Sequence, residues 1–338
     1  MRVLEIFGDS VDLGRGHGSA CAEMIRKYTD DRIDLTSQED WSGGDADREL
    51  ILACADETLA HHEQFSENLY AEMLALAGAA GITPQEAIAV GGFTDLVDLV
   101  RTRARGVRDE HNCTGIVNPR TGTLAQTWDM HASAGEFVIM LKIDPLFGPD
   151  AFVQTTAGCL GQIGMNEAGI AVGINNLTAM GKPGVTWPFV VRKALEQTDL
   201  DDAIKVVLDA DLAGGHNYFL MGPDGAGATI EAMPHHKRLT QTNGKPLVHA
   251  NNCLHAETKS EESGRLPEWV ANSDERLRIG VESADDLEAF FANPTISRRV
   301  EDMHEVGTCG AVIMEPARLR MRAVWGVPGD HPWETFQL

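Results

Sequence analysis

The predicted secondary structure changes from mainly helical to mainly β near residues 109–113, and this change limits the folds that the chain can adopt. Before it, after a short extended start, residues 1–112 have mostly helical patterns. After it, short β-rich runs alternate with turn signals, and two helical segments lie among them at 186–197 and 200–212. Hairpins on both sides of a central helical pair predict an α+β protein with two antiparallel sheets and helices packed outside them.

Local signals place several element ends. Apolar residues at helical spacing run from 48 to 80, and Gly81 follows them as a helix-ending glycine. Thr83 and Pro84, with Glu86 close behind, predict the cap and first turn of the next helix. A further short helix is predicted over 284–292. The predicted strands cover 114–117, 123–130, 137–143, 152–156, 162–164, 170–174, 218–221, 228–232, 247–250, 310–314 and 319–324.

Composition excludes several classes of partner. The net charge of −23 over 338 residues repels phosphate backbones, so nucleic acid is not an expected partner. The negative charge favours neutral or cationic small substrates over polyanionic ones. It is equally consistent with a solvated surface that has no role in binding. No run of eighteen apolar residues is present, so we expect no membrane span. The amino terminus lacks the pattern of a secretory signal, and we therefore expect a cytoplasmic protein.

The cysteines and histidines do not form metal-binding patterns. The six cysteines lie far apart and make no C-x-x-C pair, which favours free thiols over disulfides or structural zinc. The histidine pairs at 61–62 and 235–236 are adjacent in sequence, so their side chains point to different sides of a helix or strand. We expect no metal and no cofactor.

Three short motifs stand out around the predicted strands. Asn112-Cys113-Thr114-Gly115 opens one strand, the motif at 126–129 (Gln-Thr-Trp-Asp) ends the next, and the motif at 249–252 (His-Ala-Asn-Asn) ends a later one. In this order they resemble the isopenicillin N acyltransferase family of N-terminal-nucleophile (Ntn) hydrolases. The resemblance extends to the strand 169–176, to Pro-Thr-Ile-Ser-Arg at 294–298 and to the glycine-rich segment 8–18.

The resemblance implies a fold and a maturation step. The fold is a four-layer αββα sandwich with a mainly helical amino-terminal segment. The chain would cut itself between Asn112 and Cys113. Residues 1–112 would become a small subunit and 113–338 a catalytic large subunit, the two remaining one Ntn-hydrolase domain. The self-processed pair is therefore an expected partnership, alongside a small-molecule amide substrate.

The chemistry of an amino-terminal cysteine explains why such a cut would matter. A cysteine attacks a carbonyl as the thiolate, whose ordinary pKa is about 8.5, so it needs a base. A freed α-amine has a pKa of about 7.7–8.0 and can serve as that base near neutral pH. The resemblance implies that Cys113 is the nucleophile and that Asp129 lies beside its amine.

The remaining implied site residues would stabilise charge. Asn175 and Asn251 correspond to the family's oxyanion donors, since an amide NH₂ can stabilise negative charge without acting as a base. Arg298 would lie in the catalytic pocket and hold a carboxylate by its fork, with Asp129 as a candidate. Gln126 stands where the related choloylglycine hydrolases carry arginine, which favours the acyltransferase branch. Ala250 and Asn252 depart from the family's His-Thr-Asn-His signature.

The glycines between Gly8 and Gly18 invite a different interpretation as a dinucleotide-binding loop. We interpret the segment otherwise, because no clear strand before it and helix after it make a βαβ unit.

The sequence thus predicts an autoprocessed cysteine amidohydrolase or acyltransferase acting on a linear amide of a small N-acyl or aminoacyl amine. An acyl-coenzyme A-dependent N-acyltransferase is an alternative, although the net charge of −23 gives little support for binding phosphates. A non-catalytic protein that keeps the Ntn fold for binding is another. A papain-like enzyme would need His111 beside Cys113, on the segment expected to be cut away.

Overall fold

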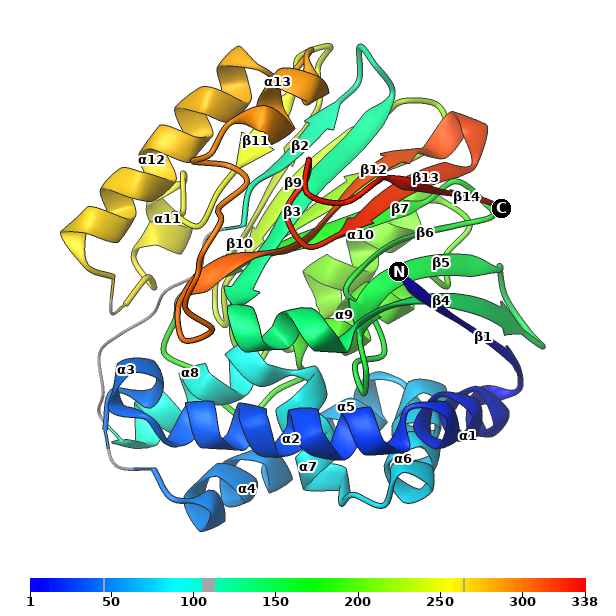
Figure 1. The fold of residues 1–338 in the computed structure, drawn as a ribbon, viewed down its shortest axis with the longest axis vertical. Coiled ribbons are helices and arrows are strands. Elements are labelled where there is room, and N and C mark those ends of the chain that lie inside the picture. Colours follow the sequence, from blue (N-terminus) through cyan, green and yellow to red (C-terminus); the bar gives the residue numbers. More distant parts are fainter. Residues whose placement is uncertain (45, 105–112, 264) are drawn as a thin grey trace.

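A computed structural model describes residues 1–44, 46–104, 113–263 and 265–338 (Figure 1). Asn112, on one side of the predicted cleavage site, and His111, considered for a papain-like enzyme, lie outside the described residues. Cys113, on the other side of that site, is described.

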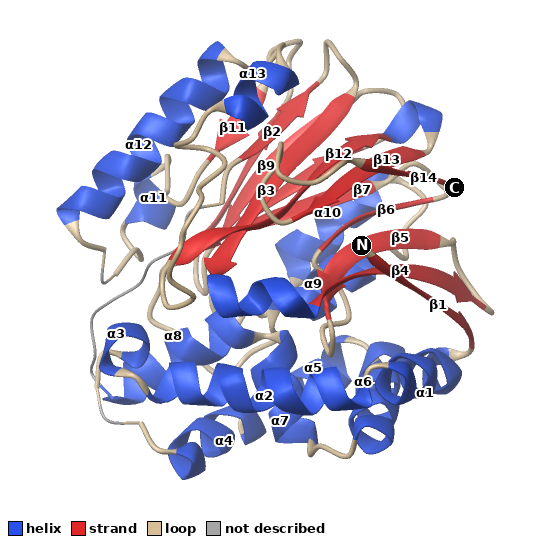
Figure 2. Cartoon of the chain, viewed as in Figure 1, coloured by secondary structure: helices blue, strands red, loops and turns tan. Residues whose placement is uncertain are grey.

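Two β-sheets form the centre of the molecule (Figure 2). The first has eight strands in the order β1 (Arg2–Gly8), β4 (Val138–Pro145), β5 (Ala151–Thr156), β6 (Ile163–Asn166), β7 (Ala171–Leu177), β8 (Gly215–Met221), β9 (Gly227–Ala232) and β10 (Lys237–Gln241). The second has six, in the order β11 (Leu247–His249), β2 (Gly115–Asn118), β3 (Thr123–His131), β12 (Val306–Glu315), β13 (Arg320–Trp325) and β14 (Glu334–Gln337). The paired strands are antiparallel except β1 and β4, which are parallel.

Helices cover the outer faces of both sheets. On the first sheet lie α9 (Trp187–Ala194) and α10 (Leu200–Asp209), and on the second α12 (Pro267–Glu282) and α13 (Leu287–Ala292), while the short α11 (Ala256–Lys259) contacts β10 at the edge of the first sheet. The amino-terminal helices gather at one end of the sheets in Figure 1: α1 (Ser10–Ala20), α2 (Ala22–Ser37), α3 (Glu39–Ser42), α4 (Arg48–Asp56), α5 (Leu59–Phe65), α6 (Glu67–Ala80), α7 (Pro84–Gly91) and α8 (Phe93–Ala104). Two short 3₁₀ turns cover Ala132–Phe137 and Pro316–Arg318.

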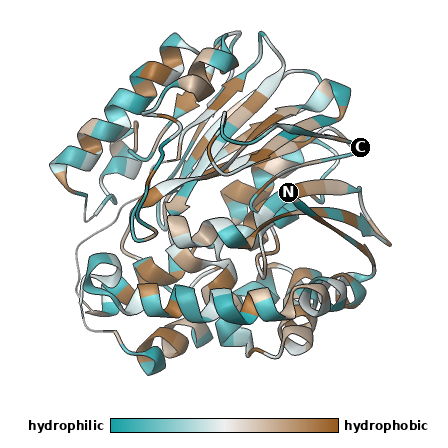
Figure 3. Cartoon of the chain, in the orientation of Figure 1, coloured by the Kyte–Doolittle hydropathy of each residue, from teal (hydrophilic) through white to brown (hydrophobic). Residues whose placement is uncertain are grey.

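Alternation along the strands builds the layers. Successive side chains of a strand point to opposite faces. In β2, Val117 packs between the sheets with Phe219, whereas its neighbour Ile116 packs outward with Ile279 of α12 and Phe290 of α13. Hydrophilic residues dominate α2 and α12 in Figure 3, as expected of helices with one face in water. The predicted α+β class and the four-layer αββα sandwich are confirmed.

Most predicted elements lie within a few residues of the observed ones, with some exceptions. The helical pattern over 48–80 is divided into α4, α5 and α6, and Ser66 caps the last of these through a bond from the Leu69 amide. The cap at Thr83 forms the predicted capping box with Glu86. Strands β10 and β14 and the long helix α12 were not predicted, because their apolar positions are sparse.

The interpretation of the glycine-rich start needs correction. A strand, β1, does precede these glycines and a helix, α1, does follow, so the stated reason for rejecting a dinucleotide loop was wrong. The structure gives a better one. A Cβ added at Gly14 would lie 2.0 Å from the carbonyl oxygen of Glu72, and one at Gly18 would lie 2.4 Å from that of Leu76. These glycines let α1 and α6 approach closely, so they serve helix packing.

Within the described residues no single helix combines the length and apolar character of a membrane span, and one pair bent by 103°, α6 and α7, meets those criteria only when taken together.

Candidate active site

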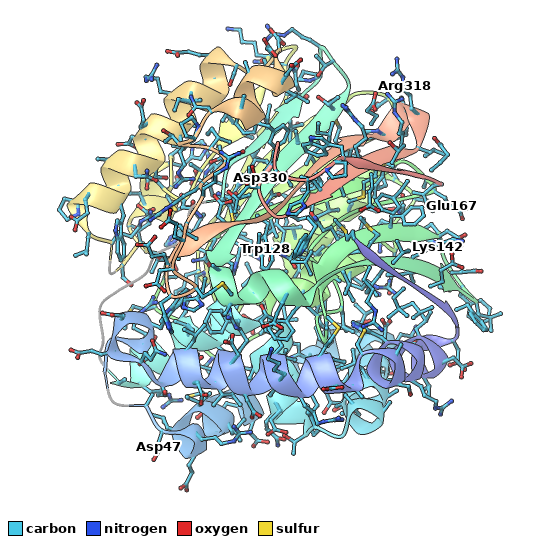
Figure 4. All side chains as sticks on the ribbon, viewed as in Figure 1. Asp47, Trp128, Lys142, Glu167, Arg318 and Asp330 are labelled. Carbon is cyan, nitrogen blue, oxygen red and sulfur yellow. The ribbon has the colours of Figure 1, made fainter. Side chains whose placement is uncertain are left out.

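Cys113 begins the segment that enters β2, and the β2–β3 hairpin returns the chain to it. In this hairpin Gly115 pairs with Gln126. As a result the Cys113 thiol lies against the backbone of Asp129, whose amide donates to Sγ over 3.4 Å and whose carbonyl oxygen is 3.6 Å from Sγ. The hairpin thus brings Asp129 alongside Cys113, as the family resemblance implied. Trp128, which precedes Asp129, lies near the centre of the molecule in Figure 4.

The Asp129 carboxylate is buried and incompletely bonded. Oδ1 accepts a hydrogen bond of 2.7 Å from the Thr308 hydroxyl, across from it on β12. Oδ2 is buried without a hydrogen-bond partner among the described residues. Burial raises the pKa of Asp129 to about 7, although the Thr308 bond and the charges of Arg276 and Arg298 act in the opposite direction. A buried carboxylate with an unused oxygen can receive a further donor.

The Cys113 thiol is protonated in this arrangement. Its side chain is buried, and burial followed by the nearby charge of Asp129 raises the pKa of Cys113 to about 12. A thiol with this pKa is a poor nucleophile near neutral pH, so the site requires a base before Cys113 can attack a carbonyl.

Arg276, on α12, is a site residue that the sequence prediction missed. Its guanidinium donates to the Cys113 carbonyl oxygen over 2.6 Å, to Thr114 Oγ1 over 2.9 Å and to Asn251 Oδ1 over 3.0 Å. Burial lowers the pKa of Arg276 to about 10, which still leaves it charged at neutral pH. The available signal was Pro267, a residue favoured in the first turn of a helix, which would have indicated α12.

Arg298 does not occupy the predicted position. Its backbone amide donates to Thr308 Oγ1 over 2.9 Å, and the residue lines a separate cleft of about 450 Å³ with Cys309 and Trp325. The predicted fork on Asp129 is not formed, because Thr308 bonds one oxygen and the other has no partner among the described residues. The charge of Arg298 lowers the pKa of the Asp129 carboxyl group.

The two predicted oxyanion donors lie in different surroundings. Asn175, near the end of β7, lines the cavity beside Cys113, and its Oδ1 accepts a bond of 3.1 Å from Asn217. Asn251 uses both ends of its amide elsewhere: Nδ2 donates to the Asn176 carbonyl over 2.9 Å, and Oδ1 receives Arg276. Asn175 therefore lines the cavity beside Cys113, whereas Asn251 holds Arg276 in position.

Gln126 joins the two sheets at this site. Its Nε2 donates to the carbonyl of Ile174, and its Oε1 accepts from the Ile174 amide over 2.8 Å. A Cβ added at Gly173 would lie 2.4 Å from Gln126 Oε1, which explains the glycine there. Gln126 thus fixes the backbone next to Asn175, a role that sequence alone did not suggest.

The cavity beside Cys113 is small, about 30 Å³, which is roughly the volume of one water molecule. Its lining comes from both sides of residue 113 and, among the described residues, contains neither lysine nor arginine: Thr94, Cys113, Trp128, Asp129, Met130, Gln162, Ile174, Asn175, Asn176, Trp187 and His216. Within the described part of the chain, no group of three His, Cys, Asp or Glu side chains is arranged to hold a metal ion. All six cysteines are free and buried.

Comparison with known proteins identifies relatives of the chain. The model of the family described as acyl-coenzyme A:6-aminopenicillanic acid acyl-transferase matches residues 117–287, half of the chain. The acyl-coenzyme A:6-aminopenicillanic-acid-acyltransferase 40 kDa form of Emericella nidulans is 26% identical over 254 residues, which cover 73% of this chain and 68% of that protein.

Two solved structures are more distant. A mutant of a conjugated bile acid hydrolase from Clostridium perfringens matches 67% of this chain and 92% of its own, with a TM-score of 0.49 and 10% identity. A penicillin V acylase from Agrobacterium tumefaciens matches 65% and 85%, with a TM-score of 0.37 and 10% identity. Likeness at this level says nothing about mechanism.

The stacked sheets, the cysteine just before β2 and the family matches identify an enzyme of the Ntn-hydrolase class, one that hydrolyses amides or transfers acyl groups. Within that class, the chain belongs to the acyl-coenzyme A:6-aminopenicillanic acid acyl-transferase family, which confirms the resemblance found in the sequence.

Proposed function

We propose that the chain cuts itself between Asn112 and Cys113 and then cleaves linear amides of small N-acyl or aminoacyl amines. In the first step the Cys113 thiol attacks the Asn112 carbonyl. The Asn112–Cys113 C–N bond breaks, the nitrogen takes the thiol proton, and a thioester forms. Water then hydrolyses the thioester, which releases the carboxyl end of residues 1–112 and returns the thiol to Cys113.

In the second stage the freed α-amine of Cys113 is the base. It takes the thiol proton as sulfur attacks the substrate carbonyl, and it returns that proton to the leaving amine. The resulting acyl-enzyme is resolved by water or by an acceptor amine. We assign to Asn175 the hydrogen bond that stabilises the oxyanion, and to Arg276 and Asn251 the orientation of the Cys113 backbone.

One observation carries this proposal. The buried Asp129 carboxylate lies beside Cys113 with an oxygen that has no partner among the described residues, while the thiol itself is protonated. A free amine created at Cys113 would supply both the missing donor for Asp129 and the missing base for the thiol.

Two observations point in opposite directions on the fate of the acyl group. The family and its Emericella relative are named for acyl transfer involving coenzyme A. In contrast, the described lining of the Cys113 cavity has no lysine or arginine to bind the phosphates of coenzyme A. We favour hydrolysis. Incubating the processed enzyme with an N-acyl amine and a second amine, and measuring free acid against exchanged amide, decides between them.

We also propose that the protein is cytoplasmic. The six buried free thiols are suited to a reducing compartment. Fractionation of producing cells, with antibody detection of the chain, tests this.

The central experiment compares three proteins: wild type, C113A and C309A. Cys309 is a matched control, because it is also buried and burial also raises its pKa to about 12. We expect wild type and C309A to be recovered as two fragments that cleave amides, and C113A to stay intact and inactive. An active C113A protein, or an intact wild type with full activity, would refute the proposal.

A further inference from the structure

The indole N–H of Trp187 is a buried hydrogen-bond donor that the chemistry described above leaves unused. Trp187 is the first residue of α9 and lines the cavity beside Cys113. Its Nε1 is buried and has no hydrogen-bond partner among the described residues. Buried indole N–H groups usually have a partner, because an unpaired donor has lost the hydrogen bond that water would provide. A cavity-lining donor of this kind therefore indicates a bound group that accepts a hydrogen bond.

The surroundings of Trp187 fix its position. Its backbone amide donates to Asp95 Oδ2, from α8, over 2.7 Å. The amide of the preceding residue, Thr186, donates to His62 Nε2, from α5, over 3.0 Å. These two bonds attach the start of α9 to two helices of the amino-terminal segment, and the Trp187 ring lies 6.0 Å from the His216 ring between centroids. The indole is thus held in place, as a recognition group has to be.

The charges around the cavity select the kind of acceptor. The described lining has no lysine or arginine, and it includes the buried carboxylate of Asp129. A second buried carboxylate, Asp95, has Oδ1 3.3 Å from Nδ1 of the cavity-lining His216, so it would balance a proton on that imidazole. Burial raises the pKa of both carboxyl groups, because this region disfavours negative charge. An anionic group is therefore disfavoured, and an ammonium group has no lone pair with which to accept, which leaves an uncharged oxygen.

The size of the cavity limits the group that carries this oxygen. A volume of about 30 Å³ is roughly that of one water molecule, so about one or two non-hydrogen atoms fit beyond the carbonyl that Cys113 attacks. In the proposed mechanism the acyl group is the part of the substrate that stays on Cys113 after the amine leaves. The cavity therefore suits a short acyl group.

We propose that the Trp187 indole N–H recognises an uncharged oxygen on a short acyl group, and that the preferred substrates are amides of small hydroxyacyl or oxoacyl groups. This inference rests on the proposed function, because it takes Cys113 as the nucleophile that holds the acyl group. Among the substrates proposed above it selects N-acyl amines over aminoacyl amines, since an ammonium group cannot accept the bond. A substrate that lacks the oxygen leaves the buried donor unpaired, which is how a polar site rejects an apolar analogue.

Three amides of one amine, with acyl groups of equal size, test this proposal. Hydroxyacetyl, propanoyl and glycyl groups place a hydroxyl, a methyl and an ammonium group at the same position. We expect kcat/KM of the processed enzyme to be about 10- to 100-fold higher for the hydroxyacetyl amide than for the propanoyl amide, the effect of leaving one buried donor unpaired. The glycyl amide should be cleaved no faster than the propanoyl amide. All rates are taken per processed chain, with the processed fraction measured by intact mass.

Matched variants assign the preference to the indole. W187F keeps an aromatic ring and removes the N–H, so it should lower kcat/KM by about 10- to 100-fold for the hydroxyacetyl amide and change it by less than about threefold for the propanoyl amide. W325F is the control, because Trp325 Nε1 already donates to the Gly135 carbonyl over 2.7 Å and Trp325 lines the separate cleft with Arg298. W325F should keep the wild-type preference. If W187F does not fold, the comparison of the three amides in the wild type still tests the proposal.

Several results would overturn the role of Trp187. These are equal kcat/KM for the hydroxyacetyl and propanoyl amides in the wild type, a W187F protein that slows all three amides alike, and a W187F protein that keeps the wild-type preference. Cleavage of other amides but of none of these three would also overturn it. Failure of the proposed function is a different result, in which C113A cleaves the same amides as fast as the wild type.

Discussion

Replacing Arg276 should be among the most damaging single changes in this protein. Its guanidinium supplies the hydrogen bonds to the Cys113 carbonyl, to Thr114 Oγ1 and to Asn251 Oδ1, all within the buried region beneath α12. Methionine has a similar length and fills much of the same space, but it donates no hydrogen bond. The R276M substitution therefore isolates the polar contribution of this residue.

The structure gives the expected size of the stability loss in R276M. Each buried acceptor left without a donor costs about 1–3 kcal/mol, and three are left. The substitution also removes the cost of burying a charge, which offsets part of this loss. That cost is substantial, because burial lowers the pKa of Arg276 to about 10. We expect a net loss of about 3–4 kcal/mol in the free energy of unfolding, within the range for breaking one side of a buried charged network. R276K, which keeps the charge but not the fork, should lose less.

The assay is urea denaturation of R276M and R276K in the C113A background. C113A removes the nucleophile, and with it any difference in chain cleavage, while keeping the carbonyl that Arg276 binds. The midpoint and slope together give the change in free energy. A loss below about 1 kcal/mol for R276M would mean that Arg276 does not hold this region together, and the assignment of its bonds would be refuted.

Two further predictions concern helix packing and pH. G14A should destabilise the protein by several kcal/mol in urea denaturation, because its Cβ would lie 2.0 Å from the Glu72 carbonyl oxygen. G16A in the same helix is the control: its Cβ meets only Ile6, at 3.4 Å, so it should be neutral or stabilise by up to about 1 kcal/mol, and equal effects at both positions would contradict the packing account. Burial raises the pKa of Asp129 to about 7, above the ordinary value of 3.8, so ionising this group costs stability as pH rises through that interval. In the C113A background D129N should therefore be more stable than its parent by a few kcal/mol at pH 8 and similar to it at pH 4, whereas a difference that does not change with pH would contradict the buried, raised pKa.

Local patterns in the sequence were sufficient to predict the α+β class, whereas the four-layer sandwich was implied by the family resemblance. β-rich runs between turn signals located β2 and β3, and the capping box at Thr83 marked the start of α7. Helix α12 was missed because only a few of its sixteen residues are buried, so its apolar periodicity is weak. Tertiary contacts rather than local patterns determine such a helix. Here the contact is made by Arg276, which extends from α12 to the Cys113 carbonyl.

The site was predicted in part for the same reason. The family resemblance implied that Asp129 lies beside Cys113, and the β2–β3 hairpin brings the two together because Cys113 lies just before β2 and Asp129 lies in β3. Arg298 was chosen from a local motif, yet the arginine that reaches the Cys113 carbonyl comes from α12. The support of the backbone next to Asn175 by Gln126 depends on how the two sheets stack, which no spacing in the sequence reveals.

Intact mass measurement of the purified protein, combined with amino-terminal sequencing and an amide-hydrolysis assay on the same sample, tests the account most directly. The account predicts two chains, the larger beginning at Cys113, and activity that rises in proportion to the cut fraction. A single chain of 338 residues beginning at Met1 with full amide-cleaving activity would contradict it.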